Sequence, residues 1–464
     1  MRVFLRIALD VLFNDIKMIK SSMKKTLPLI LFTLCNYLIV IKSYAQNDLP
    51  KIVNFDVNAD TVARTVVMRY KVEDLDSDSL IVMVRIYSVS GDLIETGPHL
   101  TGDINHPLKA AGEKKIVWHY PDTLKSILTC KVKLIVDDLY KIDVAELVSQ
   151  VDTTRLKTDM VTAIYGVRHN KRPDHIRSVR TFIYESFHKN KLEVSRQDID
   201  VGIEKYRFNG QNIIGQINGM QDEQKSFVLT AHFDTQKDSP GADDNGSGVV
   251  GMLEAMRILA KYSFKYSIKF IGFDLEEVGF LGSRVYVSDG GIRKNELIQG
   301  VINFDMIGSY SSKPNSQIVP PGFDQIFPKA CAAISADSYR ANFAINTSNE
   351  KSVALSAAFS DAAKNYVPQL KVVSLVASGN GEDTPQLAAS DHVVFWINGY
   401  HALHIGDGGE TRNIYLDTKK DVLNLINYTF IGNIVKSTVA TLAQLSEIQH
   451  SVATMSNINP ASIK

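Results

Sequence analysis

The chain has 464 residues, which exceeds the usual size of one domain and predicts two or three. Its hydrophobic content of 45% and charged content of 22% are ordinary for a soluble globular protein. Basic and acidic residues both number 51, so the formal net charge is zero and nothing indicates a nucleic-acid partner.

The first 45 residues are interpreted as a signal peptide region, with Met18 and Met23 as alternative candidates for the true start. A lysine pair precedes an apolar stretch over residues 27–41, and small residues follow up to Ala45. This order is typical of a secretory signal peptide. An uncleaved anchor is the alternative, but the apolar run is short for a spanning helix and contains Asn36. We therefore expect cleavage after Ala45, export to the periplasm or the medium, and no stable membrane insertion afterwards.

Two cysteines, Cys130 and Cys331, lie beyond the predicted signal region and in different predicted domains. Two cysteines do not make a disulfide framework. The sequence leaves open whether they pair or remain free thiols.

Residues 46–140 are predicted to form a β-sandwich. Short strand-like runs with turn signals between them cover residues 65–72, 80–87, 115–120 and 130–136. The near absence of helical periodicity favours a sandwich that looks like a fibronectin III or immunoglobulin-like module. No catalytic pattern is visible in it, so its expected role is spacing, docking or stabilisation of its neighbour.

Residues 141–464 are predicted to form a second domain, in which strands alternate with helices. Strand-like runs cover residues 206–217, 226–231, 267–273, 297–305, 370–376 and 402–405. The last helical pattern runs from Thr418 to about Leu445. Such alternation predicts an α/β fold with a doubly wound mixed sheet.

Three of these strands are followed by residues of the types that commonly bind metal ions. His232 and Asp234 follow the first, Glu276 and Glu277 the second, and Asp305 the third. A glycine-rich loop with a further aspartate, residue 244, precedes the helix after the first strand. Ligands bind outside the carboxyl ends of strands in open α/β sheets, so one imidazole and several carboxylates there predict a metal site.

The motifs at these positions resemble the zinc aminopeptidases of peptidase family M28. They are His232-Phe-Asp234, Gly241-Ala-Asp-Asp244-Asn-Gly-Ser-Gly248, Glu276-Glu277-Val-Gly-Phe-Leu-Gly-Ser283, Asn303-Phe-Asp305-Met-Ile-Gly308 and Ser390-Asp391-His392. All five occur in the order that the family shows. The resemblance implies a zinc-exopeptidase-like fold and a site for two zinc ions.

The resemblance also implies a role for each ligand. His232 and Asp305 would hold one zinc ion, and Glu277 would hold the other. Asp244 would bridge the two ions, which a single carboxylate can do across roughly 3.5–4 Å. The family's last ligand is a histidine, where this sequence has Asp417. Zinc accepts carboxylate oxygen, so Asp417 can still be a ligand.

Two further residues are implied in catalysis. Asp234 would accept the second N–H of His232 and fix its tautomer. Glu276 would be the general base that takes a proton from the attacking water and passes it to the leaving amine. In an extended chain Glu276 and Glu277 would point in opposite directions and could do different work.

Asp417 also admits a second interpretation. Thr418 and Asp421 match a capping box, which would place Asp417 just before the first turn of a helix. There Asp417 would lie outside the metal shell and be stabilised by the helix end.

The predicted function is an exported aminopeptidase that acts on peptides or proteins with two zinc ions. Two alternatives remain: a glutaminyl-cyclase-like acyltransferase with one zinc ion, and a non-catalytic binding protein built on a peptidase fold. The complete set of His232, Asp244 and Asp305 favours the peptidase, and Asp417 favours the non-catalytic protein.

Overall fold

The computed structural model describes residues 48–460, except 76–78, 89–91, 122–123, 125–126 and 171. The predicted signal region therefore lies outside the described residues. Within them, no helix has both the length and the apolar character needed to cross a membrane.

The N-terminal β-rich region consists of two facing sheets. The first has the order β20 (Asn459–Pro460), β1 (Lys51–Asp60), β2 (Thr65–Glu73), β7 (Glu113–His119) and β5 (Leu100–Gly102). The second has the order β19 (Ser451–Asn457), β8 (Lys131–Asp137), β3 (Leu80–Tyr87) and β4 (Leu93–Glu95), and β6 (Pro107–Leu108) pairs with β3. Alternate residues of β2 are buried, and their side chains share one apolar core with residues of β3, β7 and β8.

The last described strands of the chain belong to these sheets. β19 pairs antiparallel with β8, so that Ser451 faces Asp137, and β20 pairs parallel with β1. The predicted boundary had assigned everything after residue 140 to the second domain. Pairing between distant parts of a chain leaves no local sequence signal, which is why residues 451–460 were not placed here. Cys130 is buried in this core, and Cys331 is a free thiol, so the two cysteines do not pair with each other.

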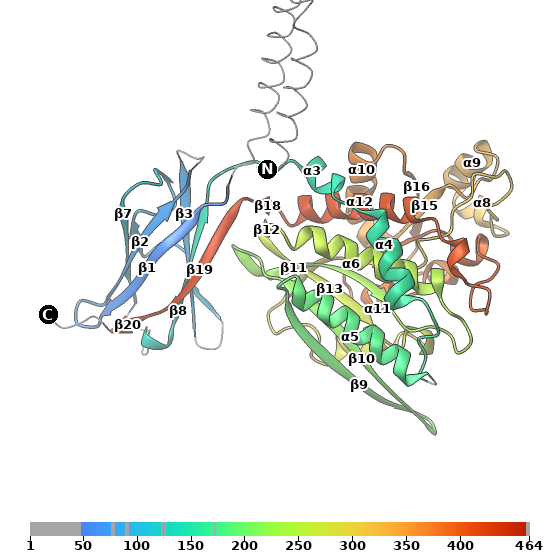
Figure 1. Ribbon diagram of the computed structural model, residues 1–464, viewed down its shortest axis with the longest axis horizontal. Helices are drawn as coiled ribbons and strands as arrows, with labels where there is room; N and C mark the ends of the chain where they lie inside the picture. The colour runs from blue at the N-terminus through green and yellow to red at the C-terminus, as the bar shows by residue number, and fades with distance from the viewer. Residues whose placement is uncertain are drawn as a thin grey trace, which may run out of the picture. The chain divides into compact units, whose positions relative to one another are not determined.

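The second domain is built on one mixed sheet, as predicted (Figure 1). The order of its eight strands is β16 (Lys371–Ala377), β15 (Phe343–Asn349), β17 (Ala402–Gly406), β14 (Leu297–Phe304), β11 (Asp222–His232), β13 (Tyr266–Phe273), β10 (Tyr206–Ile217) and β9 (Glu193–Ile203). The sheet has two strands more than the sequence indicated, because β9 and β15 were not expected. The central strands β13, β11, β14 and β17 are parallel to one another. Their carboxyl ends therefore meet at one edge of the sheet.

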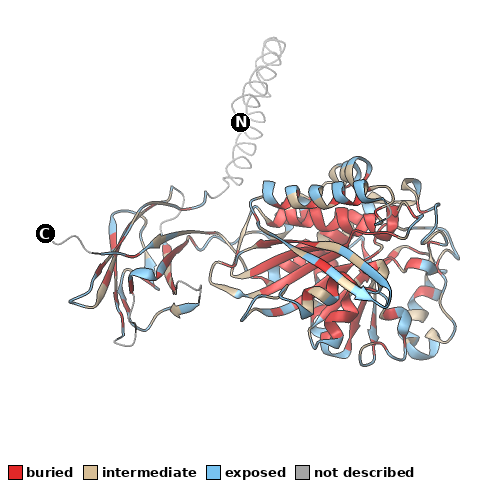
Figure 2. Cartoon of the chain, turned by 90° about the horizontal axis from the view of Figure 1, so that it is seen from below, coloured by how far each residue is buried: buried red, intermediate tan, exposed pale blue. Residues whose placement is uncertain are grey.

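Helices cover both faces of this sheet. One face packs against α5 (Pro173–Lys189), α6 (Gly248–Leu259), α10 (Val353–Tyr366) and α12 (Tyr428–Leu445), and α3 (Val144–Ser149) and α4 (Thr153–Asp159) join them. The other face packs against α7 (Leu281–Ser288) and α11 (His392–Ile397). Successive residues of β11 alternate between the faces, with Leu229 in the first core and Val228 in the second. Figure 2 shows the buried residues gathered along the central strands and the sheet-facing sides of the helices.

The predicted capping box before α12 is wrong. The helix begins at Tyr428, and the side chain of its N-cap, Asn427, accepts a hydrogen bond from the Phe430 N–H. Thr418 instead bonds within its own turn, to the carbonyl oxygen of Tyr415. The T-x-x-D pattern is short enough to occur in turns as well as at helix starts, so it did not discriminate between them.

Candidate metal centre

The predicted site residues meet at the edge where the parallel strands end. His232 is the last residue of β11, and Asp305 directly follows β14. Glu276 and Glu277 begin a short 3-10 turn three residues after β13. Because parallel strands end side by side, residues far apart in the sequence are delivered to one place.

The first group of potential metal ligands comprises His232, Glu276 and Asp305, whose ligand atoms lie within 4.8 Å of one another. All three side chains are buried. Nε2 of His232 lies 3.3 Å from Oδ1 of Asp305 and 4.0 Å from Oε2 of Glu276. Ser390, from the last of the five motifs, hydrogen-bonds the Asp305 carboxylate and accepts a bond from the Asn303 amide at 2.8 Å.

The second group comprises Asp244, Glu277 and Asp417, again within 4.8 Å of one another. Asp417 is exposed at the edge of this group, in a turn with φ of +59°. Asp244 also adjoins the first group, because its Oδ1 lies 3.3 Å from Nε2 of His232. One carboxylate therefore lies between the two groups, in the place that a bridging ligand requires.

Asp234 contacts both the imidazole and the acidic turn. Its Oδ1 lies 3.5 Å from Nδ1 of His232. The same carboxylate accepts the backbone N–H of Glu276 at 3.0 Å and that of Glu277 at 3.2 Å. A single buried side chain thus holds the backbone of two predicted site residues and lies beside the ring of a third, although the expected hydrogen bond to Nδ1 of His232 is not formed.

Glu276 and Glu277 were expected to point in opposite directions from an extended chain, but the chain is not extended at these residues. They occupy a 3-10 turn that follows Leu275, whose φ is +58°. Their side chains nevertheless diverge, one into each group. Gln236 holds Glu277 in place, with its backbone N–H 3.0 Å from one carboxylate oxygen and its amide nitrogen 2.9 Å from the other.

The carboxylates of the two groups carry more negative charge than the one imidazole among them can neutralise. Burial, and next the neighbouring Asp244, raise the pKa of Glu277 to about 9. Burial also raises the pKa of Glu276 well above its usual value, and Asp305 adds to this. Among the described residues, the ion pairs of these carboxylates are all with His232. A crowded set of carboxylates and one imidazole, without a lysine or arginine partner, fits divalent cations that take oxygen and nitrogen ligands.

Arg168 supports the two ligand groups by binding the backbone beside them, and no sequence pattern indicated this role. Its side chain is fully buried, and burial lowers its pKa to about 10. The guanidinium donates to the carbonyl oxygen of Phe233 at 2.6 Å and to those of Pro240 and Gly241 at 3.0 and 2.9 Å. It therefore ties the segment between His232 and Asp234 to the loop that leads to Asp244. Its acceptors are backbone atoms, so no motif could have identified it.

Asp421 supports the same loop from the other side. Its carboxylate accepts the backbone N–H of Asp243 at 3.0 Å and that of Asp244 at 3.0 Å. Asp421, which the sequence had suggested as part of a helix cap, thus holds the backbone of the predicted ligand Asp244.

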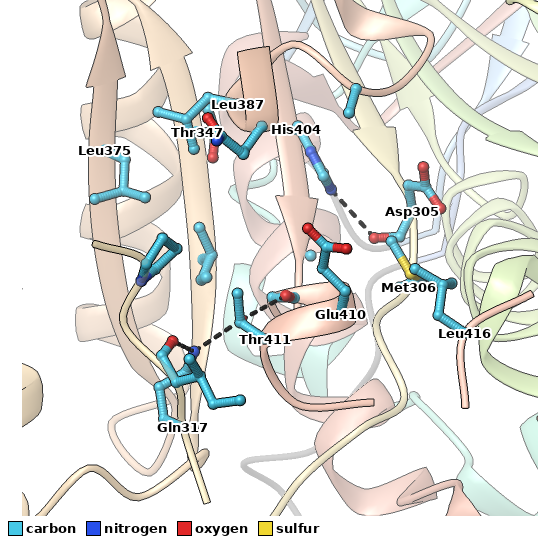
Figure 3. Close-up of a pocket in the computed structure, with 18 of the residues that line it drawn as sticks. Asp305, Met306, Gln317, Thr347, Leu375, Leu387, His404, Glu410, Thr411 and Leu416 are labelled. Carbon is cyan, nitrogen blue, oxygen red and sulfur yellow. Dashed lines mark hydrogen bonds between the residues drawn. The ribbon is translucent and has the colours of Figure 1, made fainter. Parts of the chain in front are cut away.

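A cavity of about 350 Å³ opens beside the two groups (Figure 3). His232, Asp244, Glu276, Glu277, Asp305 and Asp417 all line it. Away from them much of its wall is apolar and comes from α9 (Pro328–Ala336), β15 and β16, with Ile334, Ile345, Val373 and Leu375 among its residues. The cavity thus joins a polar end to an apolar chamber.

Comparisons with known proteins agree with this geometry. Residues 212–442 match peptidase family M28. Aminopeptidase YwaD of Bacillus subtilis is 40% identical over 112 residues, which are 24% of this chain and 24% of YwaD. The uncharacterized protein YfbL of Escherichia coli is 25% identical over 283 residues, 58% of this chain and 80% of its own. This chain thus covers about a quarter of the length of YwaD.

The fold has a counterpart among solved structures. The LapA aminopeptidase of Legionella pneumophila superimposes with a TM-score of 0.50 at 20% identity, over 66% of this chain and 78% of that one. At this identity the likeness concerns the fold alone. The family match covers the strand ends that carry the two groups, from β10 to α12. Residues 212–442 are therefore similar to the metallopeptidases of peptidase family M28.

Proposed function

We propose that the protein is an aminopeptidase that uses two zinc ions to remove N-terminal residues from peptides. The observation that carries the proposal is the position of Asp244, which belongs to the second group of ligands and also lies 3.3 Å from His232 of the first. A shared carboxylate between two ligand groups is the arrangement that a pair of adjacent cations needs.

His232 and Asp305 would hold one zinc ion, Glu277 and Asp417 would hold the other, and Asp244 would bridge them. Imidazole and carboxylate are both common zinc ligands. The ions would supply Lewis-acid polarisation of the scissile carbonyl group and would acidify the attacking water.

The chain's own residues hold and move the protons. Glu276 is buried beside His232 and is the carboxylate of the first group left over once the ligands are assigned. It would accept a proton from the water and return it to the leaving amine. Asp234 fixes the backbone of Glu276 and lies 3.5 Å from Nδ1 of His232, where it would accept the ring's second N–H once the imidazole binds zinc.

The cavity supports action at the end of a peptide. Its apolar chamber is suited to the side chain of one residue, while the scissile bond lies at the polar end. We infer from this shape that the substrate's first side chain enters the chamber and that the rest of the peptide leaves through the opening.

The direct test compares three substrates with purified, zinc-loaded protein. Leucine 4-nitroanilide should be hydrolysed, whereas N-acetyl-leucine 4-nitroanilide, which lacks a free amine, should not. The third substrate, a peptide with N-terminal glutamine, should lose that residue rather than cyclise. Cyclisation would support the acyltransferase alternative, and inertness towards all three would support a non-catalytic protein.

Export is a separate part of the proposal and concerns residues outside those described. Its basis is the basic, apolar and small-residue order of the first 45 residues. Sequencing the N-terminus of protein recovered from the periplasm or the medium should read Gln46 first. Recovery of the uncleaved chain from the cytoplasm would contradict it.

A further inference from the structure

The cavity beside the metal centre holds one carboxylate that neither ligand group uses. Of the six acidic residues that line the cavity, five belong to the two groups, and the sixth is Glu410. Within the described part of the chain, the Glu410 side chain has no hydrogen-bond or ion-pair partner, and its residue is exposed to the cavity. In Figure 3 its carboxylate lies in the space between Thr411 and Asp305.

The backbone that carries Glu410 is held firmly. The residue occupies a 3-10 turn, Gly409–Thr411, which begins three residues after the end of β17. The Gly409 N–H donates to the Asp407 carboxylate at 2.9 Å, and the Thr411 hydroxyl donates to the Gly408 carbonyl oxygen at 2.6 Å. Gln317 crosses from another segment and donates to the Thr411 hydroxyl at 2.8 Å. Glu410 is therefore a carboxylate presented from a fixed position, which lowers the entropic cost of binding a partner.

Zinc ions would compensate the charge of their own ligands but would leave Glu410 without a counter-ion. A carboxylate beside an apolar chamber is suited to a ligand that carries a cation next to an apolar group. An amino acid with a free ammonium group has this combination.

We propose that Glu410 binds an ammonium group of the substrate and so selects peptides with that cation in the first residue. The inference deepens the proposed aminopeptidase function and rests on it. Two sources share the required chemistry: the α-ammonium group that every free N-terminus carries, and the side-chain ammonium group of an N-terminal lysine.

Binding of three alcohols to zinc-loaded protein distinguishes these sources and needs no turnover. Leucinol carries an α-ammonium group, lysinol carries an α- and a side-chain ammonium group, and 4-methylpentan-1-ol carries neither. The variant Glu410→Gln keeps the shape of the side chain and removes its charge. Glu185→Gln removes the same charge from an exposed site on α5, outside the cavity, and serves as the matched control.

If Glu410 pairs with the α-ammonium group, Glu410→Gln should weaken leucinol and lysinol alike, by about tenfold or more, and leave 4-methylpentan-1-ol unchanged. If it pairs with the side chain, only lysinol should weaken. Glu185→Gln should change none of the three. Equal affinities in Glu410→Gln and wild type, or an equal loss for all three alcohols, would overturn the inference.

The proposed function has its own readout in the hydrolysis of leucine 4-nitroanilide by wild type. If that hydrolysis occurs and Glu410→Gln binds all three alcohols as wild type does, only the inference fails. If hydrolysis is absent while the affinities shift as expected, the aminopeptidase proposal fails and the ammonium site remains.

Discussion

The carboxyl groups of Asp244 and Asp417 each offer an oxygen within 4.8 Å of the other, although the two residues lie on different loops. Two ionised carboxylates repel at this separation, so either a proton or a cation must lie between them. Although Asp417 is exposed at the rim of the site, its partial desolvation there, and next the facing Asp244, raise its pKa to about 6. This proximity brings Asp417 into one group with Asp244 and Glu277, as a second zinc ion would require.

Replacing Asp417 should change the second zinc ion and spare the first. In Asp417→Ala we expect one tightly held ion and one whose affinity falls by more than the roughly 10–100-fold that outer-shell changes cost. Asp417→His should keep both ions, because neutral imidazole is a good zinc ligand. Metal analysis after dialysis measures this. Unchanged stoichiometry in the alanine variant would remove Asp417 from the ligand set.

Glu276→Gln should bind zinc and fold as wild type does, yet lose most of its turnover. The amide keeps the shape of the side chain but cannot accept a proton, and general acid–base groups contribute about 10²–10⁴ in rate. The measurement is kcat for leucine 4-nitroanilide, with the melting temperature and zinc content as controls. Activity within about tenfold of wild type would exclude Glu276 as the base.

Arg168 should matter for metal affinity although it contacts no predicted ligand side chain. Arg168→Met leaves the carbonyl oxygens of Phe233, Pro240 and Gly241 without their donor and should cost about 3–5 kcal/mol of stability. Arg168→Lys keeps the charge but loses the fork of donors, so its zinc affinity should lie between those of wild type and the methionine variant. If Arg168→Lys bound zinc as tightly as wild type does, the positive charge alone would suffice, and the several hydrogen bonds of the guanidinium group would not be needed to position the loop.

Zinc affinity of the second group should rise with pH. A protonated carboxyl group must lose its proton before it binds a cation, so a raised pKa weakens binding as the pH drops below it. Burial and neighbouring carboxylates raise the pKa of Asp417 to about 6 and that of Glu277 to about 9. Competition with a chelator should show affinity increasing between about pH 5 and pH 9, with less increase near pH 6 in Asp417→Asn. A pH-independent affinity would contradict the raised values.

The sequence predicted those parts of the structure that depend on local patterns. The apolar runs that precede His232 and Asp305 indicated two buried strands and the residues at which they end. The α/β sheet and the acidic residues along one of its edges could therefore be expected. The parallel arrangement then placed the motif residues in one cavity without further assumptions.

Features that depend on distant contacts could not be predicted in this way. Strand β19 pairs with β8 across most of the chain, and Arg168 binds backbone carbonyls that any sequence possesses. Asp421 belongs to a sequence pattern that fits a helix cap. In the structure its carboxylate instead accepts backbone N–H groups of the loop that carries Asp244. Glu410 belongs to no motif, and only the cavity identifies it.

The most direct test of the two-zinc proposal is a titration of metal-free protein with zinc, followed by metal content and by hydrolysis of leucine 4-nitroanilide. The protein should show no activity after chelation, should bind two zinc ions per chain with the second more weakly, and should regain activity as they bind. Full activity in metal-free protein would contradict the account, and so would saturation at a single ion that already restores the full rate.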